Sequence, residues 1–332
     1  MKRRWSVLVL SFVLGVLLLS GCGSESSSSS NYEYVIGVTQ IVEHPSLDEA
    51  FTGFKKALEE NGLVEGEDVK YDLQIAQGEI SNSDTIAKNF VGDQVDLIFA
   101  NSTPSAISAL NATKDIPIIF TSVTDPVGAE LVEAFDKPGE NITGTSDTHP
   151  LAMSNTIEFM LEEIGVKKVG VVYNAGEQNS KVQVEQVQEM LEKEGASLVE
   201  VSVSNSSEVK QAAESLVGRI DSIFFPTDNT VVQALESLID VANQNDLPLF
   251  ASELDSMEKG AFAATGFSYK DLGYQTGLMA VEILEGNKKP SEMDVEPPNV
   301  DVKLTINKKA AEEQGITIKE EWNEKADYYE GE

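Results

Sequence analysis

The sequence DLIFANSTPSAISAL, residues 96–110, decides the fold of this chain. An apolar run, residues 97–100, ends at the small polar residues Asn101, Ser102 and Thr103, and a proline then opens a segment with apolar residues at helical spacing. This pattern predicts a buried strand that leads directly into a helix. Proline suits the first turn of a helix, and the free N–H groups there, together with the helix dipole, bind carboxylate or phosphate.

A similar stretch, DSIFFPTDNTVVQAL at 221–235, follows 125 residues later (221 − 96). Two further pairs of segments match in the same order: EHPS with EQNS at 43–46 and 177–180, and DIPIIF with DLPLF at 115–120 and 246–250. Within each half, apolar strands alternate with helical patterns, which is typical of parallel sheets. The repeat therefore predicts two α/β lobes of one design.

Length and charge narrow the class of protein. A chain of 332 residues suggests two domains of ordinary size. It carries 24 Lys and Arg against 56 Asp and Glu, a net charge of −32, which excludes nucleic acid as the main ligand. We interpret the acidic surface as a solvated face that keeps an exported protein in solution.

The N-terminus is typical of a bacterial lipoprotein signal. Basic residues at 2–4 precede an apolar run at 5–19, and the sequence LSGC then ends at Cys22, the only cysteine of the chain. The alternative is a plain transmembrane anchor, but the run is shorter than the ~20 residues that a span needs. We expect residues 1–22 to be a signal peptide, Cys22 to carry the lipid, palmitate included, and the Ser-rich residues 23–33 to be a tether.

Motifs for catalysis are lacking, so we expect no enzyme activity and no cofactor. The sequence holds no GxSxG, P-loop, GxGxxG or HExxH. Its two histidines, His44 and His149, each precede a proline just before a predicted helix. A role at the helix start is favoured over a metal site, because two histidines alone rarely complete one.

Polar side chains gather where the predicted strands end. The hydroxyls of Ser102, Thr103, Thr121 and Ser122 suit an anion, and the carboxylates of Glu177 and Asp228 suit a cation. Each hydroxyl alone is equally well explained as a helix N-cap, but the repetition favours a site. An amino acid carries both charges. A sugar site would favour stacked tryptophans, whereas one of the two here lies in the signal peptide and the other, Trp322, is placed in the tail.

Aromatic side chains also lie beside these strand ends. Phe120, Tyr173 and Phe225 are positioned to enclose a ring, although aromatic residues at strand ends more often belong to the core. The last folded element is predicted to be a short helix ending at Gly315, after an extended segment at 290–298.

Six segments together resemble the ABC transporter substrate-binding lipoproteins of the tryptophan/tyrosine-binding type. They are TQIVEHPSLD (39–48), NSTP (101–104), FTSVTDPVGA (120–129), YNAGEQNS (173–180), PTDN (226–229) and LGYQTGLMA (272–280). The resemblance implies an α/β fold of the type I periplasmic-binding-protein kind, with two Rossmann-like lobes with parallel sheets joined by a three-stranded hinge. It also implies ligand contacts at Gln40, Glu43, Asn101, Ser102, Thr103, Thr121, Ser122, Tyr173, Asn174, Glu177, Asn179, Thr227, Asp228 and Asn229.

The predicted first lobe comprises residues 34–146 and about 267–292, and the second comprises residues 147–266 and about 293–332. Glycine and small polar residues indicate linkers near Gly144–Pro150 and Ala264–Ser268.

We expect an extracytoplasmic monomer, anchored to the membrane by its lipid, that binds an amino acid, with an aromatic one such as Trp or Tyr favoured. It would deliver this ligand to an ABC permease with a cytoplasmic ATPase. Two alternatives remain: a sensory or adhesive lipoprotein with the same ligand-binding fold and no transport role, and a surface hydrolase, which the missing motifs disfavour.

Overall fold

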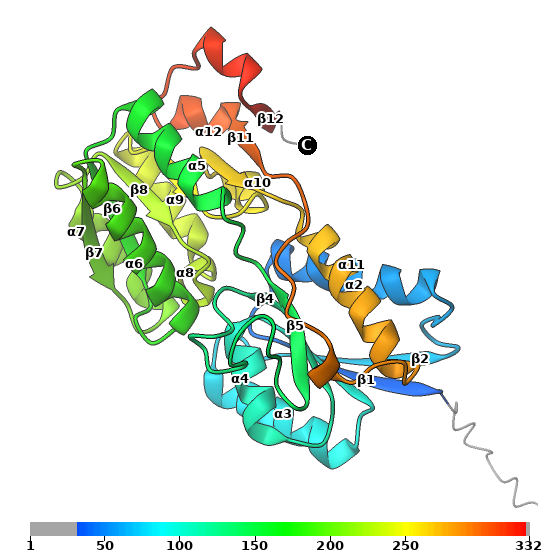
Figure 1. The fold of residues 1–332 in the computed structure, drawn as a ribbon. Coiled ribbons are helices and arrows are strands. Elements are labelled where there is room, and N and C mark those ends of the chain that lie inside the picture. The colour runs from blue at the N-terminus through cyan, green and yellow to red at the C-terminus, as the bar shows by residue number, and fades with distance from the viewer. Residues whose placement is uncertain (1–31, 330–332) are drawn as a thin grey trace, which may run out of the picture. The chain divides into compact units, whose positions relative to one another are not determined.

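A computed structural model describes residues 32–329 of the chain (Figure 1). The predicted signal peptide, Cys22 and almost all of the predicted tether lie outside the described residues. Within residues 32–329, no helix is both long enough and apolar enough to cross a membrane.

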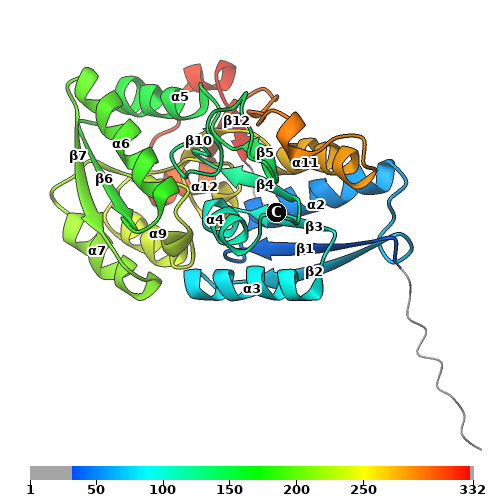
Figure 2. The same cartoon turned by 60° about the horizontal axis from the view of Figure 1, so that its bottom comes forward.

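The first sheet is parallel and has the strand order β2-β1-β3-β4-β5. Its strands are β1 (Tyr34–Gln40), β2 (Val69–Ile75), β3 (Leu97–Asn101), β4 (Ile118–Val123) and β5 (Ile142–Ser146). Helices α2 (Pro45–Glu60) and α11 (Tyr269–Leu284) cover one face, and α3 (Ile80–Asp93) and α4 (Thr103–Ala112) cover the other (Figure 2).

Strand β3 is apolar throughout because both of its faces are covered. Leu97 and Phe99 pack beneath α2 and α11, whereas Ile98 and Ala100 pack beneath α3 and α4. All five of its residues are buried. A parallel strand between two helical layers has no solvent face, which explains a continuous apolar run in place of alternation.

Helices α2 and α11 come from distant parts of the chain and pack in direct contact. A Cβ atom added to Gly53 would lie 1.9 Å from the carbonyl oxygen of Lys270, and one added to Gly273 would lie 1.8 Å from that of Ala50. Only glycine permits this approach of the two backbones. This close contact with α11 fixes the position of α2 on the first sheet, and with it the turn between β1 and α2.

The second sheet repeats the first. Its order is β12-β11-β10-β9-β8-β6-β7, so β7-β6-β8-β9-β10 corresponds strand by strand to β2-β1-β3-β4-β5. Among the described strands of this sheet, only β10 and β11 pair antiparallel. The strands are β6 (Lys168–Tyr173), β7 (Ser197–Ser202), β8 (Ser222–Phe225), β9 (Leu249–Ala251), β10 (Ala263–Gly266), β11 (Lys303–Asn307) and β12 (Asp327–Tyr329). The prediction of two α/β lobes with mostly parallel sheets is confirmed.

The helices of the second lobe are mostly short. They are α5 (Ala152–Glu158), which continues as a π-helix at Phe159–Ile164, then α6 (Gln178–Lys193), α7 (Val209–Leu216), α8 (Asn229–Val232), α9 (Leu235–Gln244), α10 (Ser256–Lys259) and α12 (Lys308–Glu313). Short 3₁₀ turns lie at Ser206–Glu208, Pro290–Glu292 and Glu320–Glu324.

Within residues 32–329, the chain passes between the two sheets three times: from β5 to α5, from β10 to α11, and from the turn at Pro290–Glu292 to β11 (Figure 1). The predicted linkers began too early, because Gly144–Ser146 belongs to β5 and Ala264–Gly266 to β10. A Cβ atom on Gly144 would lie 2.0 Å from the carbonyl oxygen of Phe120, so this glycine allows a close strand pair and does not mark a loop.

The end of the fold was predicted wrongly, because the chain does not leave the core after Gly315. Strand β12 pairs with β11, and Trp322 is only 1% exposed. The indole packs edge-on against Phe159 and donates its N–H to Glu163 Oε2 at 3.0 Å. The segment at 290–298 likewise begins with a 3₁₀ turn and not as an extended chain. Strand β12 and the 3₁₀ turn that begins at Pro290 are each too short to show a hydrophobic period in the sequence.

Candidate ligand-binding site

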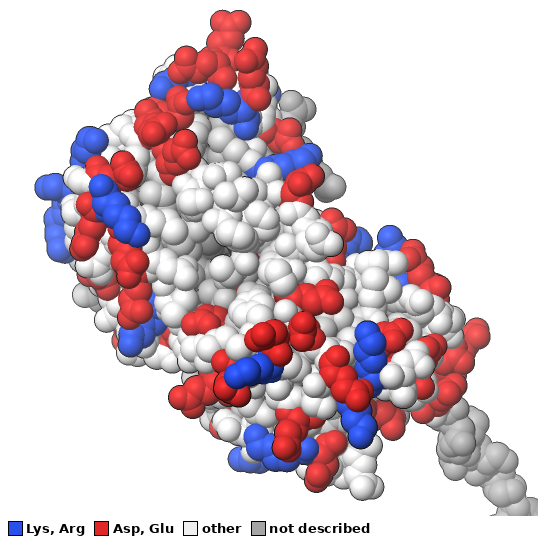
Figure 3. All heavy atoms as spheres, viewed as in Figure 1, with Lys and Arg blue, Asp and Glu red and all other residues white. Residues whose placement is uncertain are grey.

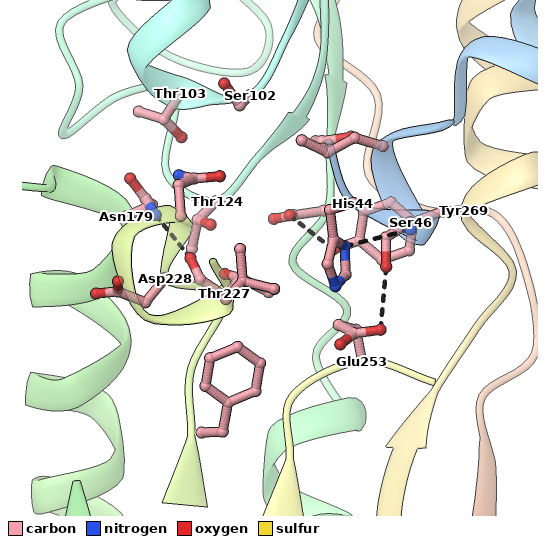
Figure 4. A pocket seen from close by; sticks show the side chains of 16 residues that line it. His44, Ser46, Ser102, Thr103, Thr124, Asn179, Thr227, Asp228, Glu253 and Tyr269 are labelled. Carbon is pink, nitrogen blue, oxygen red and sulfur yellow. Dashed lines mark hydrogen bonds between the residues drawn. The ribbon is translucent and has the colours of Figure 1, made fainter. Parts of the chain in front are cut away.

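A cavity lies between the strand ends of the two lobes (Figure 4). It is lined from the first lobe by His44, Ser46, Leu47, Ser102, Thr103, Ser122 and Thr124, and from the second by Asn179, Phe225, Thr227, Asp228, Asn229, Val232 and Glu253. Asp147, directly after β5, and Tyr269, the first residue of α11, complete the lining. The carboxyl ends of parallel strands are where α/β folds bind ligands.

Three of the hydroxyl-bearing residues with which the first lobe lines this cavity are Ser102, Thr103 and Ser122. Ser102 caps α4, accepting the N–H of Ser105 at 3.4 Å, and Ser122 lies in the last part of β4. Both have positive φ, 116° and 56°, which is uncommon for residues other than glycine and is typical of functional sites. The Thr103 hydroxyl is buried and has no hydrogen-bond partner, so this wall offers a free polar group at a helix start.

Three predicted ligand residues lie behind this wall and do not line the cavity. Asn101 donates to Gln40 Oε1 at 3.0 Å and to the Leu47 carbonyl at 2.7 Å, and it accepts the Ser122 hydroxyl at 2.9 Å. Thr121 shares a hydrogen bond of 3.0 Å with Thr145. These buried side chains position Leu47 and Ser122. Glu43 is exposed and lies outside the cavity lining.

In the second lobe, two buried carboxylates converge on the start of α8. Asp228 Oδ1 accepts the N–H groups of Thr230 and Val231 at 3.0 and 2.7 Å, and its Oδ2 accepts that of Asn174 at 2.6 Å. Glu177 accepts from the backbone and side chains of Asn229 and Thr230. Burial, with the negative charge of Glu177 beside it, raises the pKa of Asp228 to about 7.

The other predicted residues of this lobe separate into two groups. Asn179 and Thr227 line the cavity: the Asn179 amide donates to the Thr227 carbonyl at 2.7 Å, and its own Oδ1 is buried without a partner. Tyr173 and Asn174 do not line it. The Tyr173 hydroxyl donates to Glu200, and Asn174 donates to the Thr230 hydroxyl, so both support the loops.

The sequence prediction missed several lining residues, chief among them Asp147, Glu253 and Tyr269. The Tyr269 hydroxyl donates to Asp147 Oδ2 at 2.9 Å, and Asp147 Oδ1 is buried without a partner. Burial raises the pKa of Asp147 to about 6 and also raises that of Glu253. A signal for Glu253 was present, because it closely follows the repeated segment at 246–250, after the end of β9.

Ser46 connects the two lobes across the cavity. Its hydroxyl donates to Glu253 Oε2 at 3.0 Å, and its N–H donates to His44 Nδ1 at 3.3 Å. The corresponding histidine, His149, accepts the N–H of Leu151 at 3.2 Å. The prediction that both histidines act at helix starts is confirmed, while His44 also lines the cavity.

The cavity is acidic and partly apolar. Asp147, Asp228 and Glu253 line it, and no lysine or arginine is among the described residues that do so. Leu47, Phe225 and Val232 supply apolar surface, whereas Phe120 belongs to the core of the first lobe. The site can therefore hold a cationic group, an anion at the hydroxyl wall, and an apolar body between them. Among residues 32–329, no three His, Cys, Asp or Glu side chains come together as a metal site would require.

Comparison with known proteins matches these features to one family. Residues 35–329 match the model of the ABC transporter substrate binding protein family. The chain is 46% identical over 289 residues to a tyrosine-binding protein of Clostridioides difficile (strain R20291), and the match covers 84% of this chain and 83% of that protein.

Two solved structures share the fold. One is an ABC domain from Streptococcus pneumoniae in complex with L-Trp, 34% identical, with a TM-score of 0.84, covering 89% of this chain and 99% of that one. The other is the ligand-free, open structure of CD0873 from Clostridium difficile, a substrate binding protein with adhesive properties. It is 43% identical, with a TM-score of 0.66, covering 90% of this chain and 100% of that one. The chain belongs to the ABC transporter substrate-binding proteins, of the tryptophan/tyrosine-binding type.

Proposed function

We propose that this protein binds a free aromatic amino acid, tyrosine or tryptophan, between its lobes and delivers it to the permease of an ABC importer. The observation that carries the proposal is the cavity itself, where a wall of hydroxyls at the start of α4 faces carboxylates and apolar side chains. A zwitterion with a ring complements all three kinds of surface. The 46% identity to a tyrosine-binding protein supports the same ligand class.

The ligand carboxylate is assigned to the wall of Ser102, Thr103 and Ser122. With no basic side chain among the described lining residues, hydroxyls and the N–H groups of α4 are the groups left to balance a negative charge. The unpartnered hydroxyl of Thr103 is the first candidate. A buried polar atom without a partner costs free energy that a ligand oxygen would recover.

The ligand ammonium is assigned to Asn179 Oδ1 and the Asp228 carboxylate. Asn179 Oδ1 is buried and free, whereas Asp228 already accepts three backbone N–H groups. A cation beside Asp228 would offset the burial that raises the pKa of this carboxyl, and would favour its ionised form. Thr227 and Asn229 complete this wall, and Gln40, Asn101, Thr121, Tyr173, Asn174 and Glu177 are assigned to positioning.

Lobe closure is the proposed mechanism. The structure matches the L-Trp complex better than the ligand-free, open structure, with TM-scores of 0.84 and 0.66, although the sequence is closer to the latter. We infer that the lobes described here are in the closed arrangement. A ligand stabilises this arrangement by binding it more tightly than the open one. We propose that the lobes move relative to each other at the boundaries predicted from the sequence, near residues 146, 266 and 292.

Substrate-binding proteins of ABC transporters work outside the cytoplasmic membrane. We propose that Cys22 carries a lipid that anchors this one, that residues 23–33 tether the folded part, and that the protein works as a monomer. In Figure 3, acidic and basic side chains surround an uncharged centre of the viewed face, as expected for a solvated protein.

A second candidate function, adhesion, is favoured by one observation, the 43% identity to a substrate binding protein with adhesive properties. Deleting the gene separates the two: loss of tyrosine uptake supports transport, and loss of surface attachment with normal uptake supports adhesion.

Calorimetry with a series of analogues tests the proposed ligand. The ligand-free protein should bind L-tyrosine or L-tryptophan, should bind tyramine and 3-(4-hydroxyphenyl)propionate at least about 100-fold more weakly, because each lacks one charged group, and should not bind glucose. If tyramine bound as tightly as tyrosine, the assignment of the ligand carboxylate to the wall of Ser102, Thr103 and Ser122 would be wrong. If neither tyrosine nor tryptophan bound, the proposed function would be wrong.

A further inference from the structure

Two further buried polar atoms, on residues that line the cavity with Tyr269, have no hydrogen-bond partner. They are His44 Nε2 and Asp147 Oδ1. Figure 4 places His44 with Ser46, Glu253 and Tyr269 on one side, away from Ser102 and Thr103. Since buried polar groups in native proteins are almost always paired, this end of the cavity is built for a hydrogen-bonding group of the ligand.

His44 presents a donor to this end. Its Nδ1 accepts the N–H of Ser46 at 3.3 Å, so in the neutral ring the proton resides on Nε2. Burial lowers the pKa of His44 to about 4, outweighing the nearby carboxylates of Asp255 and Asp48. The imidazole is therefore neutral at pH 7, and its free Nε2–H points to an acceptor on the ligand.

Asp147 presents an acceptor. The Tyr269 hydroxyl donates a hydrogen bond of 2.9 Å to Asp147 Oδ2 and thereby fixes the carboxylate, while Oδ1 has no hydrogen-bond partner. A hydroxyl group both accepts and donates, so it can pair with His44 and Asp147 together. An indole N–H can satisfy only Asp147, a plain phenyl ring satisfies neither, and an ammonium would leave the His44 donor unpaired.

We propose that His44 and Asp147 recognise the phenol hydroxyl of the ligand, so that the site selects tyrosine over phenylalanine and tryptophan. This inference rests on the proposed function and names the ligand within the class given there. The ring then lies against Leu47, Phe225 and Val232, between the hydroxyl wall and this polar end.

The test compares affinities for tyrosine and phenylalanine by calorimetry in the wild type and in His44→Ala. The wild type should prefer tyrosine by about 100-fold, since a site built for a hydroxyl strongly rejects a ligand that lacks one. His44→Ala should weaken tyrosine binding by at least about tenfold and phenylalanine binding by less than about threefold. Thermal melting of each variant confirms that it is folded.

Two variants sharpen the comparison. His44→Gln keeps an amide donor and should recover part of the preference for tyrosine, whereas His149→Ala removes the matched helix-start histidine outside the cavity and should change neither affinity. Equal losses for both ligands in His44→Ala, or a wild type that binds phenylalanine as tightly as tyrosine, would overturn the inference and leave the proposed function standing. A wild type that binds no aromatic amino acid would overturn both.

Discussion

The hydrogen bond between Ser46 and Glu253 should stabilise the closed arrangement, and Ser46→Ala tests this. Ser46 lies in the first turn of α2 in the first lobe, Glu253 follows β9 in the second, and their side chains meet at 3.0 Å where both are buried. A bond between the lobes contributes only when the lobes are closed. Its loss therefore reduces the closing equilibrium and, in proportion, the affinity for ligand.

The size of the effect follows from the partners of Glu253. A hydrogen bond to a charged group contributes about 1.5–3 kcal/mol, which corresponds to about 10- to 150-fold in affinity. In the variant, Glu253 keeps the N–H of Ser256, at 3.0 Å from Oε2, and its hydroxyl. The carboxylate is thus not left unpaired, and the lower end, about tenfold, is expected. Most of the change should appear as faster ligand dissociation.

The assay is calorimetry with tyrosine, combined with stopped-flow measurement of dissociation. Thr52→Ala is the matched control, because Thr52 lies on the same helix and its hydroxyl bonds only the Asp48 carbonyl, at 2.9 Å on the exposed side. This variant should bind like the wild type. If Ser46→Ala binds tyrosine within about twofold of the wild type, the bond does not stabilise closure and the reasoning fails.

Further predictions concern stability. Burial raises the pKa of Asp147 from 3.8 to about 6, which means that the folded protein favours the protonated carboxyl. The contribution of Asp147 to stability is therefore full below pH ~4 and is lost as the pH rises through about 6. Asp147→Asn should therefore raise the unfolding free energy of the ligand-free protein at pH 7.5 by up to about 3 kcal/mol and change it little at pH 4. Urea denaturation at the two pH values measures this difference. Equal effects at both pH values would contradict the raised pKa of Asp147. Trp322→Ala should lower the free energy of unfolding by about 3–5 kcal/mol, measured by the same method, because it leaves a cavity beside Phe159. A loss below about 1 kcal/mol would indicate that Trp322 is not part of the core. Gly53→Ala should lower the melting temperature by several degrees, whereas Gly92→Ala, where the added Cβ meets nothing within 4 Å, should not.

The fold was readable from the sequence because the repeat and the apolar runs are strong signals. The segments at 96–110 and 221–235 became β3 with α4 and β8 with α8, at equivalent places in two sheets of the same order. Parallel strands covered on both faces show continuous apolar runs, and these give strand positions reliably. Trp322 was misplaced because its neighbours form only a short 3₁₀ turn and a three-residue strand.

The site was only partly readable. Residues shortly after the strands, such as Ser102 and Asp228, do line the cavity, because strand ends converge on one edge of a sheet. The sequence gives no sign that Asn101 turns toward Gln40 behind the wall, since orientation depends on tertiary contacts. Asp147 lies directly after β5 and Tyr269 begins α11, and only the folded chain shows that they meet.

The measurement that tests the central claim most directly is small-angle scattering of the mature protein during titration with L-tyrosine. If the ligand binds between the lobes and closes them, the radius of gyration should fall and then level off at one equivalent of tyrosine, and an equal concentration of glucose should leave it unchanged. A radius of gyration that stays constant while calorimetry shows tyrosine bound to the initially ligand-free protein would contradict binding by lobe closure.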